Sequence, residues 1–160
     1  MKKYEFTDET KKSCGKILHR IRAVRNFNGV KKGQLGGYVE SEDNLSHDGN
    51  AWVGENARVY ENARVSENAW VSDNSKIYGT AEVYGNACVF GNACVFENAC
   101  VYGNAWVYGD AWVGGDTETH GTWIFGEARI YSNEDLKEME IRNERRINRR
   151  ISLCGTPIRR

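Results

Sequence analysis

The three histidines, His19, His47 and His120, are the residues of this sequence best suited to proton transfer near neutral pH. An imidazole titrates close to pH 7, so it can serve as a general base. His120 is the strongest candidate, because it lies in GGDTETHGTW, where Asp116 and Glu118 could orient its ring. A surface or end-cap role is nevertheless favoured for each histidine, and the sequence contains no GxSxG, P-loop, GxGxxG or HExxH pattern.

The five cysteines do not indicate a metal or redox centre. They form an odd set without a CxxC pair: Cys14, Cys88, Cys94, Cys100 and Cys154. Structural zinc sites and disulfide frameworks both require closer or paired spacings. No metal and no cofactor is therefore predicted, and free thiols fit a reducing cytoplasm.

A six-residue repeat must position these side chains. An aliphatic residue recurs without a slip at Val53, Val59, Val65, Val71, Ile77, Val83, Val89, Val95, Val101, Val107 and Val113. A small residue, alanine in every unit except Ser75, stands two places before each of them. The unit N-A-x-V-x-G/E fits a short strand followed by a bend, because Gly-Asn and Glu-Asn pairs form turns.

Three such units close a triangular coil of about 18 residues, and stacked coils pair their strands in parallel. The repeat resembles that of the hexapeptide-repeat proteins over residues 49–113. The resemblance implies their fold, the left-handed parallel β-helix. Many members are trimeric acyltransferases that use acetyl-CoA, with a histidine at the subunit boundary as general base.

A closer resemblance is to small, largely uncharacterised hexapeptide-repeat proteins of bacteriophages and prophages. It is carried by a short basic segment, a Gly-Gly-aromatic stretch and the first repeats, which read here ILHRIRAVRNF, GGYVESEDNLS and GNAWVGENARVYENARV. The resemblance implies a phage-type protein that acts in the bacterial cytoplasm. The C-terminal segment RNERRINRRISLCGTPIRR is not part of this resemblance.

The predicted fold is all-β, with three parts. Residues 1–34 form a β cap, residues 35–136 form the β-helix, and residues 137–160 form a basic tail. Ile124, Ile130 and Leu136 keep the six-residue spacing after a one-residue deletion, which sets the end of the β-helix. The cap and the tail are expected to cover the open ends of the stack.

The tail has two possible structures. A helical face through Leu136, Met139, Ile147 and Ile151 favours a helix, whereas the six-residue spacing of Ile141, Ile147 and Leu153 allows continued strands. Five arginines could contact phosphate, and so a nucleotide or nucleic acid: Arg142, Arg145, Arg146, Arg149 and Arg150. A solvated helix face, or ion pairs with the acidic β-helix, is the favoured explanation for these arginines.

Residues on either side of each valine face outward and form exterior columns along the prism. The aromatic members of these columns are the predicted binding residues: Trp52, Trp70, Trp106, Trp112, Phe90 and Tyr108. Large exposed apolar patches usually mark interfaces, and Trp and Tyr are frequent interface anchors. The competing explanation is that the rings only stack on one another between coils.

Charge and hydropathy indicate where in the cell the protein is expected. The formal net charge is zero, but residues 49–133 carry 4 basic against 10 acidic side chains, and residues 134–160 carry 8 against 5. No apolar run is long enough to span a bilayer or to act as a signal peptide. We expect a cytoplasmic protein without a membrane partner.

Three functional hypotheses follow. The first is a non-catalytic, homo-oligomeric binding protein, a trimer or dimer, that engages a host protein and inhibits a host enzyme or an antiviral defence. The second is an acyltransferase that uses acetyl-CoA and His120. The third is an oligomer that sequesters a nucleotide through arginine side chains.

Overall fold

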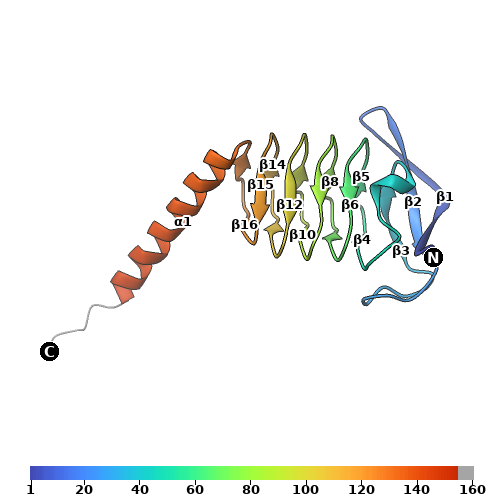
Figure 1. The fold of residues 1–160 in the computed structure, drawn as a ribbon, viewed down its shortest axis with the longest axis horizontal. Helices are drawn as coiled ribbons and strands as arrows, with labels where there is room; N and C mark the ends of the chain where they lie inside the picture. The colour runs from blue at the N-terminus through green and yellow to red at the C-terminus, as the bar shows by residue number, and fades with distance from the viewer. Residues whose placement is uncertain (155–160) are drawn as a thin grey trace.

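The computed structural model describes the backbone of residues 1–154 and the side chains of residues 1–151. A triangular stack of short parallel strands lies between an N-terminal β cap and a C-terminal helix (Figure 1). The predicted parallel β-helix is thereby confirmed. Two sequence features lie outside these limits: the last six residues of the predicted tail, and the side chain of Cys154.

Three sheets form the faces of the prism. The first runs in the order β4 (Trp52–Val53), β7 (Trp70–Val71), β10 (Cys88–Val89), β13 (Trp106–Val107) and β16 (Trp123–Ile124). The second contains β5 (Arg58–Val59), β8 (Lys76–Ile77), β11 (Cys94–Val95), β14 (Trp112–Val113) and β17 (Arg129–Ile130). The third contains β6 (Arg64–Val65), β9 (Glu82–Val83), β12 (Cys100–Tyr102) and β15 (Glu118–His120).

The repeated alanine and valine positions fill the interior. Every valine and isoleucine of the regular run is at most 1% exposed, and so is every alanine two places earlier. Backbone N–H groups donate along the axis to the next coil, as from Trp70 N to Ala87 O at 2.9 Å and from Ser72 N to Val89 O at 3.0 Å. Ser75 replaces alanine without cost, because its Oγ donates to Ser72 O at 2.7 Å.

The turns place the residue before each asparagine in the left-handed region. Glycine occupies this position in many coils, but Glu61 (φ 58°) and Glu97 (φ 56°) also adopt it. Such a conformation is unfavourable for a residue with a Cβ. Compensation comes from the carboxylates, since Glu61 accepts from Gly79 N at 2.8 Å and Glu97 from Gly115 N at 2.6 Å in the next coil.

Asparagine side chains connect the turns along one edge. Asn50, Asn68, Asn86 and Asn104 form a ladder in which each Nδ2 donates to the next Oδ1, at 3.2, 3.2 and 3.4 Å. This ladder links neighbouring turns in the direction of stacking.

The N-terminal cap is a hairpin joined to the second face. Strands β1 (Tyr4–Ser13) and β2 (Lys16–Ala23) pair antiparallel, and β3 (Leu35–Val39) pairs antiparallel with β2 and parallel with β5. A 3-10 turn, η1 (Glu42–Asn44), leads into the first coil. Strands β1 and β2 lie within the predicted β cap at residues 1–34, and the cap continues a solenoid sheet instead of forming a separate layer.

The C-terminal end carries helix α1 (Asn133–Cys154), which leaves the prism obliquely (Figure 1). The helix begins inside the range predicted for the β-helix, because Ser132 Oγ accepts from Asp135 N at 3.2 Å and caps the first turn. Leu136 is therefore a buried helical residue, 7% exposed, and no strand residue. Continued strands are excluded for residues 133–154. Over the described residues, no helix has the length and apolar character needed to cross a bilayer.

Candidate binding surface

An exposed group of rings lies on the first face, over the C-terminal coils. We call this group the aromatic face, and it consists of Phe90, Trp106, Tyr108, Trp123 and Phe125. Trp106 is 39% exposed, Trp123 55% and Phe125 46%. Only the first three residues were among the predicted binding residues. Trp123 and Phe125 were missed, although they flank Ile124 in the same phase as Trp106 and Tyr108 flank Val107.

Ring stacking orders the aromatic face. The Phe90 and Tyr108 centroids are 5.0 Å apart at an interplanar angle of 2°, and Tyr108 stacks on Phe125 at 5.6 Å. Trp106 stacks on Trp123 at 5.2 Å, and its edge meets Phe90 at 5.8 Å. The rings thus stabilise neighbouring coils and remain exposed, so the two explanations of the columns are compatible.

Trp52 corrects the predicted column, because it is fully buried, with 0% exposed. The cap covers it: Phe27 packs edge-on at 5.5 Å, and a Cβ on Gly36 would lie 2.7 Å from its ring. Its Nε1 has no hydrogen-bond partner among the described residues. Trp70, one coil further on, is only partly buried. Trp52 thus belongs to the core, and the exposed part of the column begins after it.

The second face combines a ring with cations. Trp112 is 39% exposed, and the guanidinium of Arg129 lies 4.8 Å from its ring centroid. Arg129 Nη1 also donates to Asp110 O at 2.7 Å, which fixes the guanidinium. A groove of about 690 Å³ runs along this face, where Arg58 and Lys76 continue the column of Trp112. Trp112 and Trp106 therefore face different directions and cannot contact one flat partner together.

His120 lies at the end of β15, on the third face. Its ring is 5.1 Å from that of Tyr102, and the edge of the imidazole comes close to Gly103. No hydrogen bond or ion pair joins His120 to a carboxylate in the described part of the chain. Asp116, a predicted orienting residue, accepts instead from Asn98 Nδ2 at 2.9 Å. His120 thus extends the stacked pair of Tyr84 and Tyr102, with its ring tilted by 35° to that of Tyr102.

The other two histidines lie in the cap region. His19 stacks on Phe6 at 5.0 Å. His47 stacks on Tyr4 at 4.2 Å, and its Nδ1 accepts from Lys3 N at 3.1 Å. Burial lowers the pKa of His47, with a smaller opposing effect from the Glu42 carboxylate. Both rings pack against aromatic neighbours in the cap.

The three repeat cysteines lie on three different faces of one coil, as their spacing predicts. Cys88, Cys94 and Cys100 belong to β10, β11 and β12, and all three thiols are free. Burial raises the pKa of each thiol. A raised thiol pKa lowers the thiolate fraction at neutral pH and thus the reactivity. Among the described residues, no group of His, Cys, Asp or Glu could hold a metal ion.

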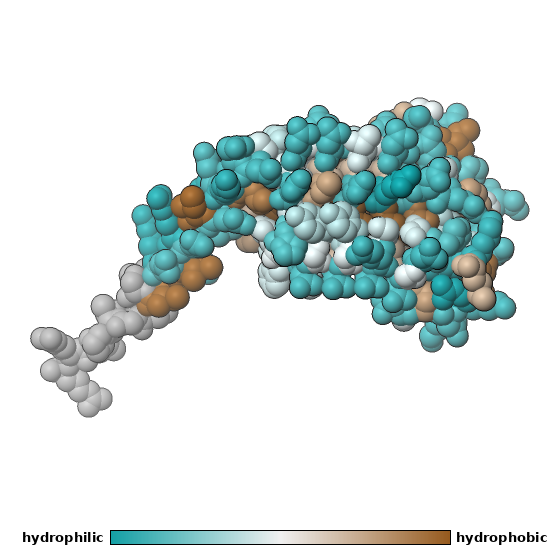
Figure 2. All heavy atoms as spheres, viewed as in Figure 1, coloured by the Kyte–Doolittle hydropathy of each residue, from teal (hydrophilic) through white to brown (hydrophobic). Residues whose placement is uncertain are grey.

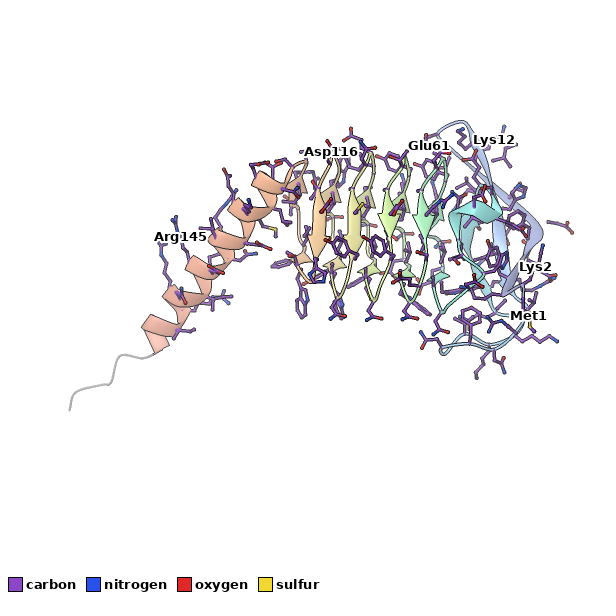
Figure 3. All side chains as sticks on the ribbon, viewed as in Figure 1. Met1, Lys2, Lys12, Glu61, Asp116 and Arg145 are labelled. Carbon is purple, nitrogen blue, oxygen red and sulfur yellow. The ribbon has the colours of Figure 1, made fainter. Side chains whose placement is uncertain are left out.

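The predicted arginines lie between the middle of α1 and its outer end: Arg142, Arg145, Arg146, Arg149 and Arg150. Arg142 contacts Glu138 one turn earlier, with Nη2 3.6 Å from Oε2. Arg145 projects from the helix at a distance from the prism (Figure 3). Apolar spheres interrupt the polar surface of α1 (Figure 2). The structure thus brings these arginines together on one helix, and Arg146, Arg149 and Arg150 line a groove that they share with Trp123 and Phe125 of the prism.

Comparison with known families agrees with this architecture. The family model described as the YdcK beta solenoid repeat matches residues 57–73 and 99–115. The chain is a β-solenoid repeat protein. Both matched segments lie inside the stack, and neither includes the cap or α1. No curated protein matches the chain.

Proposed function

We propose that this solenoid is a non-catalytic binding protein that engages a partner protein through its aromatic face. The observation that carries the proposal is the run of exposed rings on the first face, where Trp106, Trp123 and Phe125 are each between 39% and 55% exposed. Exposed clusters of this kind usually mark contacts, and Trp and Tyr dominate the energetics of interfaces.

The surrounding structure supports this proposal. Because the rings already stack on their neighbours, little side-chain entropy is lost when a partner covers them. The asparagine ladder borders the same face, since Asn86 and Asn104 stand two residues before the first residues of β10 and β13. Amide groups beside an apolar centre give the polar rim that interfaces commonly have.

The partner is a protein of a bacterial host in this proposal. The resemblance to phage hexapeptide-repeat proteins supports that choice, together with inhibition of a host enzyme or of an antiviral defence as its consequence. An acyltransferase that uses acetyl-CoA and His120, and an oligomer that sequesters a nucleotide, are the competing functions. Each competitor predicts a small molecule on the purified protein.

The test is native mass spectrometry of the tagged protein purified gently from bacterial lysate, with two matched variants. Trp106→Glu removes a ring of the aromatic face, and Trp112→Glu removes an equally exposed ring from the second face. We expect a retained host protein that is lost with Trp106→Glu and kept with Trp112→Glu. Retention that is insensitive to Trp106→Glu, or retention of acetyl-CoA or a nucleotide alone, would overturn the proposal.

A further inference from the structure

Helix α1 exposes an apolar stripe that no other element of the described residues covers. Leu136 is buried and Met139 packs against the core, so the first two turns are anchored on the prism. Ile147 and Ile151 continue the same face three and four turns further on, and they are 57% and 64% exposed. A stripe of this kind is normally buried against another element.

A groove of about 880 Å³ lies between this stripe and the last coil. Met139, Asn143 and Ile147 form one wall, and Trp123 and Phe125 form the other. Helix α1 meets the prism at its N-terminal end and diverges from it toward its C-terminal end (Figure 1). A helix can therefore enter it by its free end, whereas the end that carries a prism would collide.

The charges of α1 divide between its two halves. Residues 133–143 carry four acidic and two basic side chains, and residues 144–154 carry one acidic and four basic. The anchored half also lies beside an acidic prism, with 10 acidic against 4 basic side chains over residues 49–133. The free half of one α1 thus complements the anchored half of another, which requires antiparallel helices.

We propose that a second copy of this chain occupies the groove, with the two α1 helices antiparallel about a two-fold axis near Asn143. The free half of each helix, with Ile147 and Ile151, packs against Met139, Trp123 and Phe125 of the other copy. The two prisms point away from each other. The groove shares Trp123 and Phe125 with the aromatic face, whereas Trp106 and Tyr108 do not line it, so the dimer covers only one end of that face.

Two substitutions on one helix test the surface. Ile147→Glu places a charge in the stripe, and Ile141→Glu places the same charge outside the groove lining, about 120° around α1 from Ile147, where the native side chain is 47% exposed. Because each substitution occurs twice in a two-fold dimer, we expect Ile147→Glu to raise the dissociation constant by about 100-fold or more. The value for Ile141→Glu is expected to change less than about threefold.

Sedimentation velocity measures whether the protein is a monomer or a dimer, and far-UV circular dichroism measures its helix content. A wild-type dimer that Ile147→Glu dissociates with unchanged helix content, and that Ile141→Glu leaves intact, supports the proposal. A wild-type monomer overturns it, even if a foreign protein binds through Ile147. So does an oligomer that withstands Ile147→Glu, or one that both substitutions dissociate equally.

The orientation has its own test. Arg146→Glu with Arg150→Glu makes both halves of α1 acidic, so antiparallel copies repel each other. In a parallel dimer these arginines would face the same arginines of the other copy. Replacing them by glutamate would then exchange a repulsion between positive charges for a repulsion between negative charges. We expect the double variant to weaken the dimer by at least about tenfold at low salt, and less at high salt. An unchanged dissociation constant overturns the antiparallel arrangement.

Discussion

Trp52 and Trp106 occupy the same position of the repeat, yet their replacement by alanine should have very different consequences. Trp52 is fully buried under the cap. Phe27 packs edge-on against its ring, and Gly36 lies close both to the ring and to the side chain of Ile21. Truncation of a buried tryptophan costs about 3–5 kcal/mol. Trp106 is 39% exposed and loses mainly its stacking on Trp123, which is worth about 1–2 kcal/mol including partial burial.

Urea unfolding followed by far-UV circular dichroism measures both losses. For a chain of this size, a loss of about 3–5 kcal/mol also lowers the melting temperature by on the order of 10 °C. Trp52→Phe separates packing from polarity, because it removes a buried Nε1 that has no partner among the described residues. Since an unpaired buried donor costs about 1–3 kcal/mol, Trp52→Phe should cost less than half as much as Trp52→Ala.

The contrast between the two sites is the critical result. Equal losses for Trp52→Ala and Trp106→Ala would refute the conclusion that the cap seals the first coil. If Trp52→Ala destabilises only the cap, amide hydrogen exchange should increase in β1 and β2 while the urea unfolding transition of the prism stays in place. That outcome would show that the cap and the prism unfold separately.

Two further substitutions test buried polar groups. Thr119 occupies a valine position of the repeat, and its buried Oγ1 has no hydrogen-bond partner in the described structure. Thr119→Val should therefore raise the free energy of unfolding by about 1–2 kcal/mol. A lower urea midpoint for the variant would contradict this. Burial, with a smaller effect of Arg25 and an opposing one of Asp48, lowers the pKa of Lys3 from 10.5 to about 8. The unfolded chain therefore binds this proton more tightly than the folded protein does. As a result, the free energy of unfolding increases as the pH rises from about 8 to 10.5. At pH 7, the free energy of unfolding of Lys3→Met should exceed that of the wild type by about 1–3 kcal/mol, and this difference should decrease toward pH 10.5. A difference that stays constant over this range would show that Lys3 does not titrate in it.

The sequence predicts the solenoid well because one strong period decides it. Val53 through Val113 all enter the core, and each alanine two places earlier follows. The helical face through Leu136 and Met139 likewise predicts α1. Its first residue is harder to predict, because Leu136 fits both the six-residue spacing and the helical face, and only the cap at Ser132 decides between them.

The candidate surface was less predictable, because exposure depends on the covering elements. The repeat gives Trp52 and Trp106 the same outward position, and nothing in the repeat shows that the cap covers Trp52. The partnership of Glu97 with Gly115 N was not foreseen either, since it depends on a turn geometry that the period alone does not specify. Trp123 and Phe125 could have been found, had the columns been extended through the one-residue deletion to Ile124.

The bonds between turns also determine how such a chain can change in length. In the regular run, the carboxylates of Glu61, Asp73 and Glu97 each accept from the backbone N–H of a glycine 18 positions later: Gly79, Gly91 and Gly115. Insertion of a whole coil would keep every such pair in place and move α1 about 4.8 Å further along the axis without rotating it. Insertion of a single hexapeptide would rotate α1 by a third of a turn relative to the cap and place each carboxylate at the wrong corner. The prism thus sets both the separation and the relative rotation of its two ends, and only lengthening by complete coils preserves the rotation.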